Sequence, residues 1–176
     1  MLEKNGFLYK ELEIENWKGT IECVVDVFPS ADPLVKALEI TKKEFYPFAE
    51  IICKFAISEN LSYIAQHPIT GDVVGFMIAS DLFNESDEKI VLSYENLIKL
   101  YPILDLLEIL EKQYMKNNNL NKGQNFHCFM IGVKEKYRNK NIAKNLLNLG
   151  LAKAKEKQFE CAIAEATGRG NFSTYF

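Results

Sequence analysis

One stretch of the chain decides the fold: residues 126–133 read FHCFMIGV, and residues 134–143 read KEKYRNKNIA. The first run is short and almost wholly apolar, which is typical of a central strand covered on both faces. In the helix expected after it, four apolar or small residues share one face: Leu146, Leu147, Gly150 and Ala154. Glu160 to Ala166 reads as a second buried strand. The pattern predicts a strand–helix–strand unit, whose strands pair in parallel through a right-handed crossover.

The residues before this unit predict two helices and a β-hairpin. The expected elements are an opening strand at 7–14, a helix at 17–27 that Pro29 ends, and a second helix that starts at Asp32-Pro33, bends at Pro47 and continues past Phe55. Residues 61–66 and 73–79 are strand-like runs separated by turn-forming residues, as in a hairpin. Tyr94 to Met115 has helical spacing that is broken near Pro102.

Length and composition fit a single domain. With 176 residues, 48% of them hydrophobic, the chain can bury one core but hardly two. The net charge of −3 makes nucleic acid a poor candidate partner. The N-terminus lacks a signal pattern, and no run of about 18 apolar residues offers a membrane span. We therefore expect a cytoplasmic protein that does not bind membranes, with residues 1–176 as one α/β domain, a mixed central sheet, flanking helices and a helical insertion at about 93–117.

The cysteines do not suggest a metal site or a disulfide framework. They are widely spaced, lie in apolar stretches and form no CxxC pair. We expect all four to be reduced core residues: Cys23, Cys53, Cys128 and Cys161.

The turn after the central strand has the features of a phosphate site. Residues 134–144 contain five Lys or Arg and one Glu. A strand that runs into a helix through such a turn presents free backbone N–H groups and the positive end of a helix dipole. A solvated basic turn ahead of an amphipathic helix explains the composition equally well. Gly168-Arg169-Gly170 is a weaker phosphate loop, because no Lys-Ser/Thr follows it.

The same turn resembles a family motif. Arg138-Asn139-Lys140-Asn141-Ile142-Ala143 is similar to the Arg/Gln-x-x-Gly-x-Gly/Ala motif of the GNAT acetyltransferases, with Asn141 in place of the first glycine. Asn is one of the few non-glycine residues that adopt positive φ at modest strain. The resemblance implies that the backbone of residues 138–143 holds the pyrophosphate of acetyl-CoA, and that Ile131 and Val133 pair with the pantetheine arm. It implies an N-acetyltransferase without a metal, in which a small-molecule amine attacks the thioester directly in a ternary complex.

A second segment resembles one branch of this family in particular. Phe28-Pro29-Ser30-Ala31-Asp32-Pro33-Leu34 is similar to a stretch in the arylalkylamine and dopamine N-acetyltransferases. That branch also has a helical insertion before the CoA-binding strand, which residues 94–115 would supply.

Two residues are candidates for the base that deprotonates the amine, directly or through a water. Asp32 matches the position of a catalytic glutamate in the dopamine-acetylating relatives, and its alternative role is to cap the helix that begins at Pro33. His127 matches the first of two strand histidines in vertebrate-type relatives, but Phe129 stands at the second position. A hydrogen-bonded core histidine is the alternative there.

The end of the chain sets a further expectation. The family's proton donor is usually a tyrosine on the last helix, and Tyr175 falls short of that position. GNAT folds continue into two more strands, so we expect a chain that lacks its C-terminal strands, leaves the strand at 160–166 as an edge, binds CoA, turns over poorly and associates as a homodimer. The alternative function is a CoA-binding GNAT-like regulatory module with impaired catalysis, which Asn141 and the single strand histidine favour.

Overall fold

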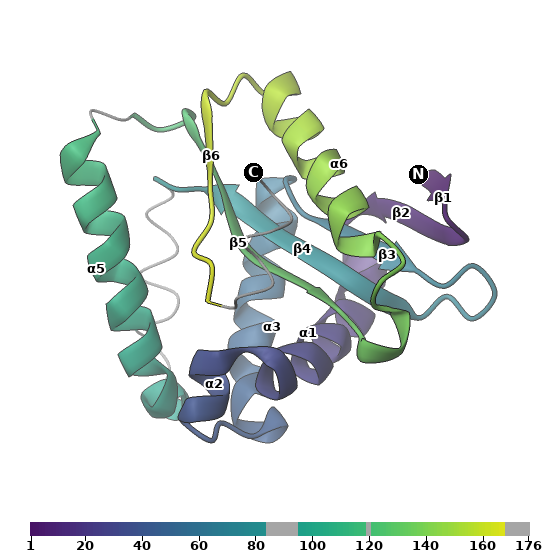
Figure 1. Cartoon of the computed structure of the whole chain (residues 1–176), viewed down its shortest axis with the longest axis horizontal. Helices are drawn as coiled ribbons and strands as arrows, with labels where there is room; N and C mark the ends of the chain where they lie inside the picture. The colour runs from purple at the N-terminus through teal and green to yellow at the C-terminus, as the bar shows by residue number, and fades with distance from the viewer. Residues whose placement is uncertain (84–94, 119–120, 168–176) are drawn as a thin grey trace.

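The sheet runs through the molecule in the order of the sequence. The computed structural model describes residues 1–83, 95–118 and 121–167. Within them six strands pair in chain order: β1 (Leu2–Lys4), β2 (Phe7–Glu11), β3 (Tyr63–Gln66), β4 (Val73–Asp81), β5 (Asn125–Val133) and β6 (Cys161–Ile163) (Figure 1). Each neighbouring pair is antiparallel except β5 and β6, which are parallel. The helix α6 (Ile142–Glu156) makes the crossover, so the predicted strand–helix–strand unit and the hairpin are confirmed.

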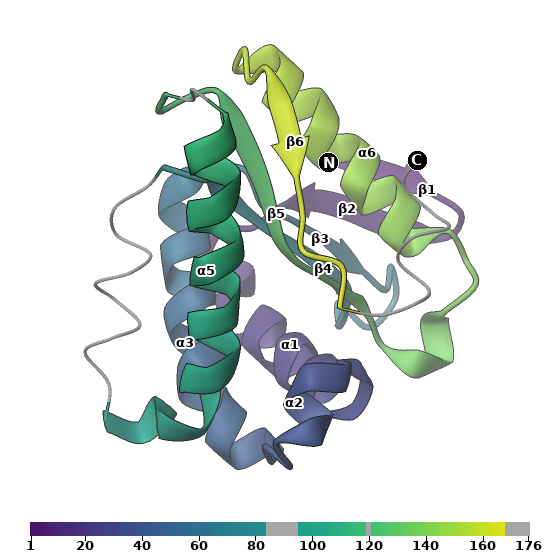
Figure 2. The same ribbon diagram turned by 60° about the vertical axis from the view of Figure 1, so that its left-hand side comes forward.

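Helices cover both faces of this sheet. The helices α1 (Trp17–Ala31) and α3 (Lys42–Glu59) pack on one face, and α6 packs on the other (Figure 2). The strand β4 alternates between the two cores: Val73, Phe76 and Ile78 face α1 and α3, whereas Val74, Met77 and Ala79 lie in the core with α6. The helix α5 (Tyr101–Asn117), which follows the 3-10 helix η2 (Glu95–Leu100), lies on the α3 side. Among the described residues, no helix has both the length and the apolar character to cross a membrane.

The prediction of one continuous helix from Asp32-Pro33 past Phe55 is wrong. Instead, α2 (Pro33–Ala37) ends early and α3 begins at Lys42. Between them Glu39 takes a φ of 51°, which interrupts a helix. Thr41 then starts α3 with a capping box, in which the Thr41 and Glu44 side chains satisfy each other's backbone N–H groups.

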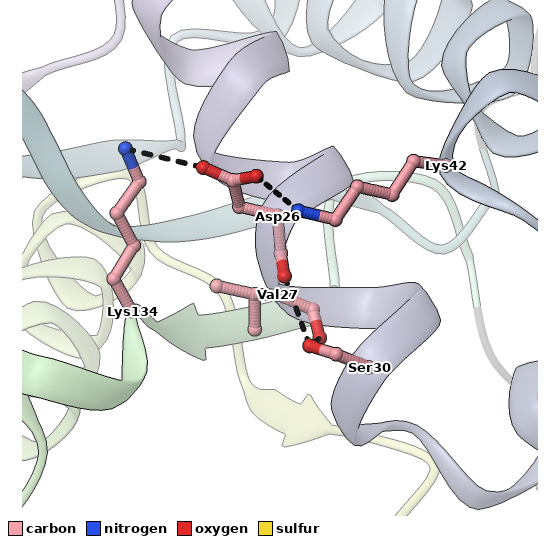
Figure 3. A network of polar contacts seen from close by, with 5 residues as sticks. All are labelled: Asp26, Val27, Ser30, Lys42 and Lys134. Carbon is pink, nitrogen blue, oxygen red and sulfur yellow. Dashed lines mark hydrogen bonds and ion pairs between the residues drawn. The ribbon is translucent and has the colours of Figure 1, made fainter.

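Two prolines behave differently from the prediction. Pro29 does not end α1, which continues to Ala31. In that turn the Ser30 hydroxyl contacts the carbonyl oxygens of Asp26 and Val27, each at 2.9 Å (Figure 3). Pro102 does not break a helix but stands in the first turn of α5, where its missing N–H has no intrahelical partner to lose. Tyr94, the expected start of that helix, lies outside the described residues.

A β-bulge in β5 changes which side chains face which core. The β4–β5 register pairs Ile78 with Met130 but Ala79 with Cys128, so Phe129 is an extra residue. As a result Phe129 and Met130 both pack toward α1 and α3.

Within the described residues the strand in the 160–166 segment is an edge of the sheet, as expected, but other features of the two edges differ from the prediction. The strand β1 was not predicted. At the other end, only Cys161–Ile163 form β6, and Cys161 and Ala162 are exposed, so a buried strand over Glu160 to Ala166 is wrong. The physical reason is that β6 is the outermost strand in the described chain and has a partner only in β5.

Cys161 on this edge is accordingly not a core residue. The other three cysteines are buried as expected, and burial raises the pKa of each of these thiols to about 12: Cys23, Cys53 and Cys128. Such thiols stay protonated and are inert.

Candidate active site

The turn between β5 and α6 leaves backbone amides available. After the 3-10 helix η3 (Glu135–Tyr137), Asn139 and Asn141 take φ values of 62° and 59°, so the expected positive φ at Asn141 is confirmed. Asn145 donates its N–H to the Asn141 carbonyl at 3.0 Å, which closes the first turn of α6. The amides before it have no intrahelical acceptor, and the Asn141 side chain makes no cap bond to them. They suit an anionic ligand at the positive end of the helix dipole.

The start of this turn is fixed to two other elements. Lys134 donates its backbone N–H to the Val74 carbonyl on β4 at 2.9 Å. Its ammonium lies 3.6 Å from Asp26 on α1, and Asp26 also binds the Lys42 ammonium at 2.6 Å (Figure 3). The hydrogen bond from Lys42 is the main cause that lowers the pKa of Asp26, against an opposing effect of burial. These contacts hold Lys134, the first residue of the turn, against β4 and α1.

A cavity of about 630 Å³ lies under the turn. It is lined by the end of β5, the turn and the junction of α1 with α2. Seven of the eight residues predicted to bind the cofactor line it: Ile131, Val133, Arg138, Asn139, Asn141, Ile142 and Ala143. Lys140 does not, because its ammonium lies over the rings of Phe7 and Tyr137. We call this space the turn cavity.

A second cavity of about 540 Å³ lies where β5 and β6 separate. The two strands pair only between residues 125–127 and 161–163, so β6 leaves the rest of this β5 edge unpaired. Its wall is mostly apolar and comes from α1, α2, α3, α5 and α6 as well as from the segment after β6. We call this space the apolar cavity.

The two cavities meet at four residues. Phe28, Asp32, Ile131 and Thr167 line both of them. A ligand that extends along the turn cavity would thus meet a second ligand from the apolar cavity at this point.

Asp32 stands at this junction with both carboxylate oxygens engaged. Its Oδ1 accepts the backbone N–H groups of Leu34 and Val35 at 2.9 and 3.0 Å, which caps α2. Its Oδ2 accepts a hydrogen bond from the Thr167 hydroxyl at 2.6 Å. The capping role considered from the sequence is therefore present, and the second oxygen faces the segment after β6.

His127 lies elsewhere. It is 2% exposed, and its Nε2 lies 2.8 Å from Oε2 of Glu165. It lines a third, small cavity of about 120 Å³ between α3 and α5, and neither larger cavity. The sequence offered both Asp32 and His127 as candidates for the base, but the structure places only Asp32 at the junction of the two cavities.

Sequence reasoning missed two acidic residues beside His127. Glu165 lines the apolar cavity, and Glu111 on α5 lines both this and the small cavity. One ligand atom from each of Glu111, His127 and Glu165 lies within 4.8 Å of the others. Burial raises the pKa of Glu165, but the hydrogen bond and charge of His127 outweigh it and leave that pKa below its ordinary value. No local motif marks either glutamate, because the three residues come from distant parts of the chain.

The structure does not test two further candidates from the sequence. Tyr175, weighed as a proton donor, and the Gly168-Arg169-Gly170 loop lie outside the described residues.

The comparison with known families agrees with this architecture. Residues 31–173 match the Acetyltransferase (GNAT) family. The match covers most of the chain, which therefore belongs to this family of acetyltransferases. No curated protein matches the sequence.

Solved structures share the fold over nearly the whole chain. The C-terminal condensation domain of Ebony, in complex with β-alanyl-dopamine, is 23% identical with a TM-score of 0.79, over 98% of this chain and 80% of that one. Arylalkylamine N-acetyltransferase 2 from Aedes aegypti is 19% identical with a TM-score of 0.80, over 96% and 79%. A polyamine N-acetyltransferase from Drosophila melanogaster is 13% identical with a TM-score of 0.73, over 96% and 79%.

Proposed function

We propose that this protein transfers the acetyl group of acetyl-CoA to a small-molecule amine, by direct attack of the amine on the thioester in a ternary complex. The observation that carries the proposal is the meeting of the turn cavity and the apolar cavity at Phe28, Asp32, Ile131 and Thr167. One space suits a long anionic donor and the other an apolar acceptor, and a carboxylate stands between them.

Acetyl-CoA would occupy the turn cavity. Its pyrophosphate would accept hydrogen bonds from the backbone of residues 138–143, where the helix dipole and the surrounding Lys and Arg side chains add positive charge. Its pantetheine arm would run along the β5 edge at Ile131 and Val133, where β6 makes no ladder. The thioester would then lie at the junction.

The amine would enter from the apolar cavity. Phe45, Phe48 and Leu104 contribute to a wall that suits an alkyl or aryl body. The names of the structural relatives, which include arylalkylamine and polyamine N-acetyltransferases, support an amine acceptor of this kind.

Asp32 is the base that the geometry favours. Its Oδ2 would take a proton from the ammonium, with Thr167 keeping the carboxylate in place. The amine lone pair then forms the N–C bond, and backbone N–H groups on the open β5 edge stabilise the oxyanion. The tetrahedral intermediate breaks its C–S bond, the nitrogen loses its second proton, and the thiolate takes up one proton, so that each acetyl transfer from an ammonium releases one proton overall. His127 is less suited to this step because it lines neither large cavity.

A turnover assay tests the proposal. Acetyl-CoA is mixed with the protein and a panel of arylalkylamines, alkylamines and diamines, and release of free CoA thiol is followed. Amine-dependent release supports the transferase. Binding of CoA by calorimetry without release for any amine would instead support the impaired regulatory module.

A further inference from the structure

The side chain of Phe129 stands between the apolar cavity and the small cavity and lines both of them. We propose that this ring closes the end of the acceptor site that lies away from the junction, so that Phe129 is a specificity-determining residue that sets the longest amine the protein accepts. The inference rests on the proposed function and deepens it, because it assigns the limit on acceptor length to one side chain.

The position of Phe129 follows from the bulge in β5. Neighbouring side chains of a regular strand point to opposite faces of the sheet, but here Phe129 and Met130 both pack toward α1 and α3. Met130 is 4% exposed, whereas Phe129 is only half-buried although it lies in a strand that helices cover. The two cavities that it borders account for this difference.

Three residues of β5 give the order of the spaces along the strand. Ile131 lines the junction of the turn cavity with the apolar cavity, Phe129 lines the apolar and small cavities, and His127 lines the small cavity. An acceptor whose nitrogen lies at the junction and whose body follows β5 therefore directs its far end at Phe129. The small cavity lies beyond that ring.

The helix α5 forms a continuous wall along both cavities. Leu104, Leu107 and Glu111 share one face of this helix, at spacings of three and four residues, and line each cavity. Among the described residues, Phe129 is the one residue outside α5 that the two linings have in common. Removal of its ring would therefore join the two spaces along α5.

Two aromatic contacts hold the ring in this position. Its centroid lies 6.3 Å from that of Phe48 on α3 and 5.7 Å from that of His127, with interplanar angles of 54° and 79°. Contacts of this kind favour one orientation of a ring. Phe48 lines the apolar cavity and His127 the small cavity, so the ring has an aromatic neighbour on each side. We therefore expect a fixed wall that a long amine does not displace.

The small cavity has the size and the lining for the end of an alkyl chain. Ile52, Phe55 and Ile78 contribute apolar surface to its wall. Its volume of about 120 Å³ is room for about four water-sized groups, and a methylene group is of similar size. Without the ring, an acceptor would extend by about three or four methylene groups, and each buried methylene increases binding about fourfold.

Linear alkylamines from butylamine to dodecylamine test this assignment, with kcat/KM measured at each chain length. For the wild-type chain, kcat/KM should rise with each methylene and stop rising once the chain meets Phe129. In Phe129→Ala the rise should continue for about three or four more carbons. The kcat/KM of these longer amines should then exceed the wild-type value by about 10- to 100-fold, because ordering of the longer chain offsets part of the gain from burial. Phe129→Leu keeps more of the core and should extend the range by a smaller step.

Phe55→Ala is the matched control. It removes a ring of the same size from a part of the small-cavity wall that the apolar cavity does not share, and it leaves Phe129 in place. Its length profile should therefore match that of the wild type. Combined with Phe129→Ala, it should extend the range beyond that of Phe129→Ala alone, because the enlarged small cavity is then open to the acceptor. A circular dichroism melt checks the fold of each variant, and Phe129→Leu carries the test if Phe129→Ala does not fold.

The remaining outcomes separate this inference from the proposed function. If folded Phe129 variants turn over amines with the wild-type length profile, or if Phe55→Ala alone shifts that profile, the inference is overturned and the transferase stands. If no amine is turned over, the proposed function fails. Calorimetry of the same amines with the wild-type and variant chains then measures the length limit directly, and a limit that Phe129→Ala leaves unchanged overturns the inference.

Discussion

The hydroxyl of Thr167 donates a hydrogen bond to Oδ2 of Asp32 across 2.6 Å and joins the segment after β6 to the start of α2. The two residues are 135 positions apart in the chain. Because Oδ1 is occupied by the helix cap, this contact fixes Oδ2, the oxygen that the proposed deprotonation would use. Capping and the proposed role as a base are therefore compatible in one side chain.

Since Oδ1 caps α2 and Oδ2 is the proposed base, we expect Asp32→Asn to lose activity but keep the stability of the fold. Asn caps helices about as well as Asp, so the free energy of unfolding should change by less than about 1 kcal/mol. Without a base, kcat/KM for the amine should fall by about 10²- to 10⁴-fold, with acetyl-CoA affinity retained. Denaturant unfolding, steady-state kinetics and calorimetry measure the three quantities. Unaltered kcat/KM and pH–rate profile would place the base elsewhere; His127→Gln is the next variant to measure.

The left-handed backbone at Asn141 predicts opposite effects of two substitutions. Proline cannot reach a φ of 59° and removes an amide donor, so Asn141→Pro should weaken acetyl-CoA binding in calorimetry by about 10-fold or more. Asn141→Gly fits this φ without strain and should retain affinity. A circular dichroism melt checks that both variants fold. If the proline variant folds and binds acetyl-CoA with unchanged affinity, the pyrophosphate does not bind at this turn.

Gly132 allows β5 to approach α1 closely. An added Cβ would lie 2.7 Å from the Phe76 ring and 2.8 Å from Val27, so Gly132→Ala should reduce the free energy of unfolding by about 1–3 kcal/mol. At Gly19 the Cβ would meet Val73 at 3.2 Å, and the helix preference of alanine offsets the contact, so Gly19→Ala should be closer to neutral. Urea unfolding of both variants gives the comparison. A larger loss at Gly19 would contradict the packing described for β5.

The hydrogen bond between Glu165 and His127 predicts a pH-dependent contribution to stability. Because the pKa of Glu165 is lower in the folded chain than its ordinary value, its ionised form stabilises the fold above that value, and this is lost as the pH falls through the folded pKa. The stability difference between wild type and Glu165→Gln should be about 2 kcal/mol near neutral pH and shrink toward about pH 3. Urea titrations across this range measure it. A difference that grows on acidification would mean that Glu165 is neutral when folded.

The sequence predicted those parts of the site that are local. The apolar strand, the basic turn and the amphipathic helix are contiguous, and their periodicities differ, so residues 126–156 could be read directly. The positive φ at Asn141 followed from the residue type and the motif. Asp32 was also visible, because a capping residue before a proline leaves a local signal.

The rest of the site depends on contacts between distant segments. Glu111 and Glu165 are ordinary acidic residues until α5 and the segment after β6 bring them to His127. Thr167 becomes informative only through its bond to Asp32. The exposure of Cys161 was also missed: the strand at 160–166 was expected at an edge, but the apolar run around Cys161 was taken to indicate burial.

The bulge at Phe129 lets one strand serve two compartments. His127 and Val133 are six residues apart and would share a face in a regular strand. With the extra residue, His127 faces the small cavity between α3 and α5, and Val133 belongs to the opposite core and the turn cavity. The number of residues in β5 thus matters as much as their identity. Deletion of Phe129 would restore strict alternation and turn every β5 side chain on one side of the deletion to the opposite face of the sheet. A substitution at this position would alter only the packing around it.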